Sequence, residues 1–166
     1  PAAVGICDSN KYNSIYCITG DGSAMFNIQE LATLASTNKN ITVIILDNAG
    51  YNSIRTSQDI HLSGRYFGSD LEQLQFPNWK LLAKAFKFNF IEIKNNSEVS
   101  TKLSKLKGNG QLLIRVLVDP NRSRTPRLVS KIANGKFLSP NLTEQYPFLD
   151  EVINLELAKL KSKYGV

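Results

Sequence analysis

The chain has 166 residues, 42 % of them hydrophobic, which is enough for one well-packed domain. Its net charge of +6 comes from 20 basic and 14 acidic residues, but most lysines fall on the polar faces of expected helices and form no continuous basic stripe. We therefore expect no nucleic-acid partner. The apolar runs are well short of the about 20 residues that cross a bilayer, so we also expect no membrane insertion.

The first residues, 1–7, have the small apolar side chains of a helix that packs closely against a sheet, and they start without a cap or a preceding strand. This abrupt start predicts an α/β fold that is truncated at its N-terminus. Cys7 of this helix and Cys17 of the next segment are expected to be buried free thiols rather than a disulfide. Such cysteines are typical of a reducing compartment, which predicts a cytoplasmic protein.

Four apolar runs predict the strands of one sheet, and they are residues 14–19, 41–46, 88–93 and 111–118. The last run is apolar at nearly every position, which is typical of a central strand in a parallel sheet. Segments with helical periodicity alternate with these runs. We therefore predict an α/β fold, a doubly wound parallel sheet with helices on both faces.

The helices are predicted from their caps and from the spacing of their apolar residues. Asn27 and Glu30 have the spacing of a capping box. Pro77 is expected in the first turn of a second helix, and Ser97 is expected to cap a third, which Gly108 ends. The remaining segments are a short helix over 51–58, a long loop over 59–75 and a final helix over 148–160.

The alternation of strands and helices ends after residue 120. Residues 121–147 are rich in Pro, Ser, Asn and Arg, as is typical of a tail that wraps over a domain. We predict an α/β domain over residues 1–120, with 121–166 as a C-terminal tail and helix that pack on the same domain.

Two polar runs directly follow the first two strands, Gly20-Asp21-Gly22-Ser23 and Asp47-Asn48-Ala49-Gly50-Tyr51. Parallel strands bring their carboxyl ends to one edge of the sheet, where open α/β sheets bind ligands, and neighbouring strands lie about 5 Å apart. The side-chain oxygens of Asp21 and Asn48, with the carbonyl of Gly50, suit the oxygen preference of Mg²⁺. Glycines also let a phosphate approach the backbone amides. These runs predict a metal–diphosphate site, although ordinary turns after each strand account for the same spacing.

The context of these runs resembles one enzyme family. Asn48 follows Asp21 by 48 − 21 = 27 positions, a spacing similar to that of the thiamine-diphosphate motif. The run Gly20-Asp-Gly-Ser-Ala-Met-Phe-Asn-Ile-Gln-Glu-Leu-Ala-Thr-Leu34 resembles the acetolactate synthase branch of the thiamine-diphosphate-dependent enzymes, as does Pro1-Ala-Ala-Val-Gly5 before it. Asp47 stands where the family often has a further Asn. The resemblance covers residues 1–120 and continues more weakly beyond them.

This resemblance implies a role for each motif residue. Asp21 and Asn48 bind Mg²⁺ through their side chains, and Gly50 binds it through its carbonyl. Ile54 lies beside the thiazolium, with ordinary core packing as the alternative. The implied cofactor-binding residues are Gly20, Gly22, Ser23, Asn48, Gly50, Tyr51, Asn52 and Ile54. The loop 59–75 and the tail 121–147 are expected to form a lid over the cofactor.

The implied activity is that of an enzyme that decarboxylates a 2-oxo acid and transfers the carbanion to an acceptor carbonyl, with thiamine diphosphate and Mg²⁺ as cofactors. In this family a glutamate of a separate pyrimidine-binding domain activates the cofactor, and the enzymes are homodimers or homotetramers. No part of this chain resembles that domain or the central domain. We therefore expect the C-terminal, cofactor-anchoring part of a longer enzyme, with no catalytic residue of its own and no activity alone.

Several alternatives remain open. Ser57 stands where true acetolactate synthases have a Trp, which favours a 2-oxo-acid decarboxylase of sugar or polysaccharide biosynthesis. A non-catalytic central or regulatory domain of the same fold would have no use for the Asp21 and Asn48 pair. A nucleotide or sugar-nucleotide binder would need a Gly-x-Gly-x-x-Gly or Walker run, which the chain lacks. Arg55 and Arg65 are candidates to pair with an anionic substrate, with a structural role as the alternative.

Overall fold

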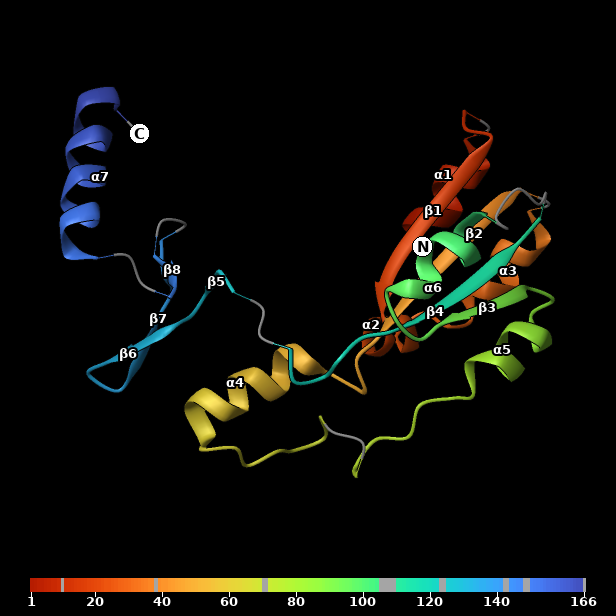
Figure 1. The fold of residues 1–166 in the computed structure, drawn as a ribbon, viewed down its shortest axis with the longest axis horizontal. Helices are drawn as coiled ribbons and strands as arrows, with labels where there is room; N and C mark the ends of the chain where they lie inside the picture. Colours follow the sequence, from red (N-terminus) through yellow and green to blue (C-terminus); the bar gives the residue numbers. More distant parts are fainter. Residues whose placement is uncertain are drawn as a thin grey trace. The chain divides into compact units, whose positions relative to one another are not determined.

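Two compact units make up the chain, Pro1–Pro120 and Asn121–Val166 (Figure 1). The computed structural model describes residues 1–165 except 10, 38, 70–71, 105–109, 123–124, 142–143 and 148–149. Within the described part of the chain, no helix is both long and apolar enough to cross a membrane.

The first unit alternates helices with four parallel strands, as predicted. Its elements are α1 (Ala2–Asp8), β1 (Ser14–Gly20), α2 (Asp21–Met25), α3 (Glu30–Ser36), β2 (Asn40–Asp47), α4 (Asn52–Leu62), α5 (Trp79–Ala85), β3 (Asn89–Ile93), α6 (Ser97–Leu103) and β4 (Leu112–Leu117). Each predicted strand is present, with ends that differ by at most one residue. The predicted α/β fold is therefore confirmed.

The sheet has the strand order β1-β2-β4-β3, so β4, the last of these four strands in sequence, lies inside the sheet (Figure 1). Connections between parallel strands are right-handed. The chain crosses the sheet in one direction from β1 to β2 through α3 and from β2 to β3 through α5, and it returns from β3 to β4 through α6. Helices α3 and α5 therefore cover one face and α6 covers the other. Helix α1 contacts α3 and joins it on the first face.

The hydrophobic core lies on the face covered by α1, α3 and α5. Alternate residues of β2 point into it, namely Ile41, Val43 and Ile45, and the next residue in this alternation is Asp47. They pack beneath side chains of α3 and α5 that include Leu31, Leu34, Trp79 and Ala83. A fully buried Leu or Ile contributes about 1.5–3 kcal/mol. The core thus fixes the ends of β1 and β2, and the same alternation buries the Asp47 carboxylate.

The predicted capping box is wrong. Helix α3 begins at Glu30 and has no side-chain cap, while Asn27 lies in the turn that follows α2. The backbone amides of residues 30, 31 and 32 already donate to the carbonyls of residues 27, 28 and 29. No first-turn donor is left for the Asn27 side chain, because the polar run after β1 forms the separate helix α2.

Two further helix starts differ from the prediction. Helix α5 begins at Trp79, after Pro77, and Asn78 caps it, since the Asn78 side-chain oxygen accepts the N–H groups of Lys80 and Leu81, each at 3.1 Å. Ser97 is the first residue of α6 and does not cap it, because its hydroxyl donates to Asn95 Oδ1 at 2.6 Å. The predicted end at Gly108 lies outside the described residues.

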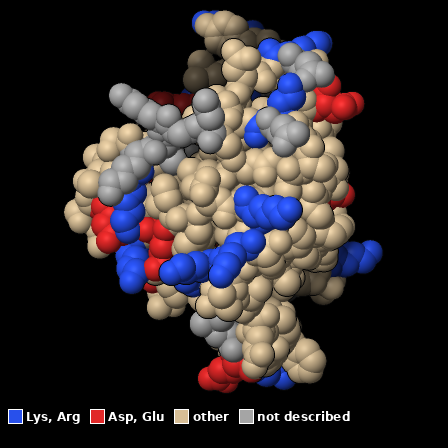
Figure 2. Space-filling model, turned by 90° about the vertical axis from the view of Figure 1, so that its right-hand side faces the viewer, with Lys and Arg blue, Asp and Glu red and all other residues tan. Residues whose placement is uncertain are grey.

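Helix α4 is longer than predicted and extends to Leu62, into the expected loop. It ends where Ser63 takes a left-handed conformation with φ of 53°. The charged residues of α5 confirm the prediction of polar helix faces, since Lys80 and Lys84 are exposed while Trp79 and Ala83 are buried. Figure 2 shows exposed basic side chains on one face, with acidic side chains beside them at its left.

The second unit holds short strands that the sequence interpretation missed. They are β5 (Arg127–Leu128), which pairs with β8 (Gln145–Tyr146), and β6 (Lys131–Ala133), which pairs with β7 (Lys136–Leu138). Asn134 and Gly135 form the turn between β6 and β7, both with positive φ, and such Asn-Gly pairs are typical of hairpins. Helix α7 (Glu151–Tyr164) begins three residues later than predicted, and residues 148–149 lie outside the described part.

Candidate functional site

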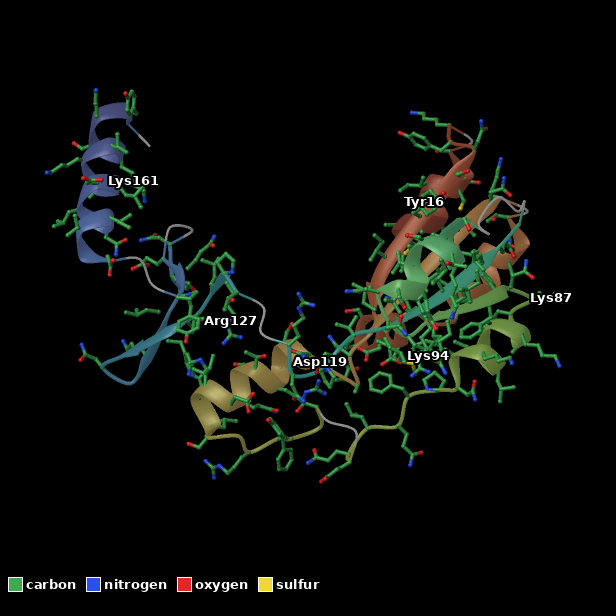
Figure 3. The ribbon with its side chains drawn as sticks, in the orientation of Figure 1. Tyr16, Lys87, Lys94, Asp119, Arg127 and Lys161 are labelled. Atoms are coloured by element: carbon green, nitrogen blue, oxygen red, sulfur yellow. The ribbon has the colours of Figure 1, made fainter. Side chains whose placement is uncertain are left out.

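The two polar runs lie side by side at the carboxyl edge of the sheet. Strand β1 ends at Gly20, opposite Leu46 of β2, and β2 ends one residue later at Asp47. In Figure 3, Lys94 and Asp119 mark the same edge, because they follow β3 and β4. The structure therefore brings Asp21, Asn48 and Gly50 together at the edge where open α/β sheets bind ligands.

The Asp21 carboxylate joins the two runs. It is only 2 % exposed. One oxygen accepts the N–H of Gly22 at 2.7 Å, and the other accepts those of Gly50 at 2.8 Å and Asn48 at 3.2 Å. Hydrogen bonds to a carboxylate are stronger than those between neutral groups. Asp21 therefore holds the loop after β2 in place from the end of β1.

Burial raises the pKa of Asp21 above its usual value. The N–H groups of Gly50 and Gly22 oppose this effect, while the neighbouring Asp47 carboxylate adds to it. A buried carboxylate next to a second one is an unfavourable place for negative charge. A bound cation would relieve that cost, which is a physical reason to expect one here.

The loop from Asp47 to Gly50 has an unusual backbone. Ala49 and Gly50 both have positive φ, 63° and 116°. This conformation costs an L-residue such as Ala49 about 1–2 kcal/mol. A Cβ at position 50 would lie 2.9 Å from the carbonyl oxygen of Ser69, so only glycine fits there. The loop is thus held in a strained shape by its surroundings.

Asn48 offers a buried side-chain oxygen as a ligand atom. Its Oδ1 atom is buried and has no hydrogen-bond partner among the described residues. An unsatisfied buried acceptor costs about 1–3 kcal/mol. The carbonyl of Gly50 accepts the N–H of Asn52 at 2.8 Å and keeps a second lone pair. Asp21, Asn48 and Gly50 therefore offer a carboxylate, an amide and a carbonyl oxygen, a donor set that suits Mg²⁺.

This donor set is not an acidic cluster. Within the described residues, no group of three His, Cys, Asp or Glu is placed to hold a metal. Mg²⁺ usually takes one or two protein carboxylates and fills its other positions with water or substrate phosphate. A site with a single ligating carboxylate thus fits Mg²⁺ with a phosphate ligand better than it fits a metal held by protein alone.

A charged network that the sequence interpretation missed supports the loop. Arg115 on β4 pairs with Asp47 at 2.7 Å and with Glu92 of β3 at 2.9 Å. Burial alone would lower the pKa of Arg115, but hydrogen bonds and charges from Asp47 and Glu92 outweigh burial and raise it. The other Asp47 oxygen accepts the N–H of Ala49 at 3.1 Å. The sequence feature that could have indicated this network is the single arginine, Arg115, within the apolar run 111–118.

The residues predicted to contact the diphosphate differ in how accessible they are. A Cβ on Gly22 would lie 2.4 Å from the Tyr51 ring, so this ring packs directly on Gly22. Phe26 and Phe76 flank the Tyr51 ring at centroid distances of 6.2 and 6.3 Å. Ser23 is exposed at the surface. The space beside Gly22 is therefore filled by an aromatic side chain.

The other predicted cofactor-binding residues differ in burial. Gly20 is half-buried, and no described atom lies within 4 Å of where its Cβ would be. Asn52 is buried and donates from Nδ2 to the carbonyl of Pro120 at 2.6 Å. Ile54 is 46 % exposed, so it does not belong to the core, and its place beside a thiazolium stays a prediction.

Part of the expected loop 59–75 is tied to α4. Gln58 is buried, accepts the Ser69 hydroxyl at 2.5 Å and donates to the Phe67 carbonyl at 3.1 Å. Ser57, at the position of interest for the acceptor substrate, is exposed. A lid role for the loop stays a prediction.

Comparison with known proteins identifies the family. The family model described as "Thiamine pyrophosphate enzyme, C-terminal TPP binding domain" matches residues 1–116. The chain belongs to this family. The resemblance inferred from the Gly20–Leu34 run is thereby confirmed, and the parallel sheet is the fold of such a thiamine-diphosphate-binding domain.

Acetolactate synthases are among the relatives of this thiamine-diphosphate-binding domain. Isozyme 2 large subunit of Escherichia coli K12 is 30 % identical over 139 residues, which are 83 % of this chain and 25 % of that protein. The large subunit of Cyanidium caldarium is 30 % identical over 146 residues, or 87 % of this chain and 24 % of that protein. Isozyme 3 of E. coli K12 is 32 % identical over 123 residues, or 72 % and 21 %. The chain thus spans about a quarter of their length.

Proposed function

We propose that this domain anchors thiamine diphosphate and Mg²⁺ in a longer, acetolactate synthase-like enzyme. That enzyme decarboxylates a small 2-oxo acid and transfers the carbanion to an acceptor carbonyl. It works in the cytoplasm as a homodimer or homotetramer, with the pyrimidine-binding and central domains supplied by the rest of the enzyme. The family membership of the chain and the acetolactate synthases among its relatives support this proposal.

The single observation that carries the metal part of the proposal is the buried, unpartnered Oδ1 of Asn48. It lies in the loop whose amides are bound by the buried Asp21 carboxylate. Asp21, Asn48 and the Gly50 carbonyl would hold Mg²⁺, and the remaining positions would be left for phosphate oxygens and water. The residues present therefore fit the group that the family membership implies.

Gly22, Ser23 and the amides of Tyr51 and Asn52 would bind the diphosphate. The Tyr51 ring lies against Gly22, so a diphosphate reaches the Gly22 backbone only when this ring turns aside. Phe26, which flanks the ring, is 74 % exposed and leaves it room to do so. Gly20 and Ile54 complete the cofactor contacts in this proposal.

When bound, thiamine diphosphate supplies the stabilisation of the carbanion that remains after a 2-oxo acid loses CO₂. The role of this chain is to bind, neutralise and orient the diphosphate end. No side chain of the chain is assigned to proton transfer, and the isolated chain is expected to be inactive. Decarboxylation or carboligation by the isolated 166-residue chain would contradict that expectation.

Equilibrium binding of thiamine diphosphate by the longer enzyme tests the anchoring role. The wild type should bind the cofactor tightly with Mg²⁺ and weakly after chelation, and Asp21→Ala should bind weakly in both conditions. Ser36→Ala is a suitable control, because this exposed α3 residue bonds only locally, to the Thr33 carbonyl at 2.7 Å. Binding of the cofactor by the wild type without any need for metal would remove the basis of the proposal.

A second candidate function is favoured by Ser57. Its side chain is exposed on α4, at the position where the sequence analysis expects the Trp of true acetolactate synthases. A small residue there suits an acceptor other than a second 2-oxo acid, as in a 2-oxo-acid decarboxylase of sugar or polysaccharide biosynthesis. Ser57→Trp should then raise acetolactate formation relative to simple decarboxylation. An unchanged ratio of the two products would argue against this role of Ser57.

A further inference from the structure

Arg55 contacts the loop from Asp47 to Gly50, here called the metal loop, with both terminal nitrogens of its guanidinium group. It lies in the first turn of α4 and turns back toward the end of β2. Its Nη2 donates to the Asn48 carbonyl at 2.9 Å, and its Nη1 donates to the carbonyls of Ala49 at 2.5 Å and Ser69 at 3.3 Å. Three backbone carbonyls therefore accept hydrogen bonds from one half-buried arginine.

These bonds complete a pattern in which three consecutive peptide groups are held at both ends. In the first peptide group, the Asp47 carbonyl accepts the Val118 N–H at 2.8 Å, and the Asn48 N–H donates to the Asp21 carboxylate. In the second, the Asn48 carbonyl accepts from Arg55, and the Ala49 N–H donates to the Asp47 carboxylate. In the third, the Ala49 carbonyl accepts from Arg55, and the Gly50 N–H donates to the Asp21 carboxylate.

Arg55 is thus the counterpart of Asp21 on the carbonyl side of the loop. The N–H and C=O of a trans peptide point in opposite directions. In this loop the amides meet the carboxylates of Asp21 and Asp47, and the carbonyls of Asn48 and Ala49 meet the Arg55 guanidinium. The guanidinium also packs closely, since Nη1 lies 3.0 Å from where a Cβ at position 50 would be. Arg55 therefore fixes the peptide groups on both sides of Ala49, which join the two residues with ligand atoms, Asn48 and Gly50.

We propose that Arg55 is a positioning residue that fixes the spacing of the Asn48 and Gly50 ligand oxygens and so makes the site selective for Mg²⁺ over the larger Ca²⁺. This inference rests on the proposed function. Mg²⁺ requires near-ideal octahedral geometry at about 2.0–2.1 Å, whereas Ca²⁺ accepts irregular sites at about 2.3–2.6 Å. A rigidly held set of ligand oxygens favours the ion with the stricter geometric requirement, so a loosened loop loses Mg²⁺ first.

The same contacts argue against an anionic substrate as the partner of Arg55. A substrate carboxylate would have to displace the carbonyls of Asn48 and Ala49, and thereby release the loop that holds the metal. Arg65, the other arginine considered for this role, is exposed, and among the described residues its side chain donates only to the nearby Leu62 carbonyl, from Nε at 3.3 Å. Arg65 is therefore a matched control that does not contact the metal loop.

The test compares Arg55→Lys with Arg65→Lys in the longer enzyme at a saturating concentration of thiamine diphosphate. Titration calorimetry gives the affinities for Mg²⁺ and for Ca²⁺ separately, and circular dichroism checks the fold. Lysine keeps the charge but lacks the planar fork that bonds two carbonyls at once. Residues that orient metal ligands typically contribute about 10–100-fold to metal affinity. We expect a loss of that size for Mg²⁺ and less than about threefold for Ca²⁺, with no change in Arg65→Lys.

An equal loss for both ions would overturn the inference, because Arg55 would then only stabilise the fold. An unchanged Mg²⁺ affinity would overturn it as well. Ala49→Gly relieves the left-handed strain and supplies a background in which Arg55→Lys can be tolerated even if the single variant unfolds. The inference requires that the ratio of Mg²⁺ to Ca²⁺ affinity is lower in the double variant Ala49→Gly/Arg55→Lys than in Ala49→Gly alone. A wild type that needs no metal would instead contradict the proposed function, which is a separate result.

Discussion

Asp21 Oδ2 accepts the backbone N–H of Gly50 at 2.8 Å, which fastens the end of β1 to the loop after β2. The residues are 29 positions apart in sequence but belong to adjacent parallel strands. The acceptor is a buried carboxyl group, and burial disfavours the ionised form that a bound metal requires. Stability and metal binding in this domain are therefore linked through Asp21.

The first prediction concerns the pH dependence of this link. The pKa of Asp21 in the folded domain is raised above 3.8, so the folded state holds its proton to higher pH than the unfolded state does. Without metal, the stability that Asp21 contributes should be fully present below pH 3.8 and be lost as pH rises through the raised pKa. Urea unfolding of the wild type and Asp21→Ala at several pH values isolates this contribution as their difference.

Metal should reverse that slope, because Mg²⁺ binds only the ionised carboxylate. The Mg²⁺ affinity should fall as pH is lowered through the raised pKa of Asp21, where protons compete with the metal. A stability difference between wild type and Asp21→Ala that rises with pH in the absence of metal would contradict this account.

The second prediction separates stability from binding at Asn48. Asn48→Ala removes a buried acceptor that has no partner among the described residues, and the relief of about 1–3 kcal/mol offsets the packing that is lost, so the free energy of unfolding without metal should not fall. Mg²⁺ affinity should fall at least about 100-fold with the loss of a ligand. Gln58→Ala is the contrasting variant, since it removes hydrogen bonds to Ser69 and Phe67 and should destabilise the metal-free domain. A large destabilisation by Asn48→Ala would mean that its side chain serves packing rather than metal binding.

The third prediction concerns the arginine that spans three strands. Arg115→Met removes the ion-pair partner of the Asp47 carboxylate and leaves the Glu92 carboxylate with Lys94, at 3.6 Å. Removing one member of a fully buried pair costs about 3–5 kcal/mol, but the Arg115 side chain is 31 % exposed, so we expect about 2 kcal/mol. Urea unfolding measures the loss, and Arg115→Met/Asp47→Asn should recover part of it. No recovery in the double variant would show that Asp47 and Arg115 act independently.

The fourth prediction concerns the space beside Gly22. In Gly22→Ala the new methyl group would meet the Tyr51 ring, which can rotate away, so the domain should still fold. Binding of thiamine diphosphate should weaken at least about tenfold, because a Cβ blocks the approach of a phosphate to the backbone. Gly5→Ala is the control, since it lies in α1 with no described atom within 4 Å and should stabilise the domain slightly. Unchanged cofactor binding in Gly22→Ala would remove Gly22 from the site.

The sequence predicted the strands well because each is a short apolar run bounded by polar residues. Helix starts were harder to predict, since several neighbouring polar residues can have the pattern of a cap. Asn27 had the pattern of a cap, but the neighbouring carbonyls already satisfied the amides of α3. Asn78 next to Pro77 was the true cap of α5. Such choices depend on the neighbouring backbone and not on the cap sequence alone.

For the site, the motif residues could be named from the sequence but their support could not. The pairing of Arg115 with Asp47 and Glu92 depends on β4 lying between β2 and β3, an order that local patterns do not encode. The bonds from Arg55 to the carbonyls of Asn48 and Ala49 depend on two residues with positive φ. Both arginines act through tertiary geometry, which only the folded chain reveals.

The central claim is that Asp21, Asn48 and Gly50 together bind the metal that holds the cofactor diphosphate. A crystal of the longer enzyme grown with Mn²⁺ and thiamine diphosphate would test it most directly through the anomalous signal of the metal. We predict a single peak at this site within about 2.0–2.3 Å of an Asp21 carboxylate oxygen, Asn48 Oδ1 and the Gly50 carbonyl oxygen. A bound cofactor with the metal elsewhere, or with Asn48 Oδ1 outside its coordination sphere, would contradict the account.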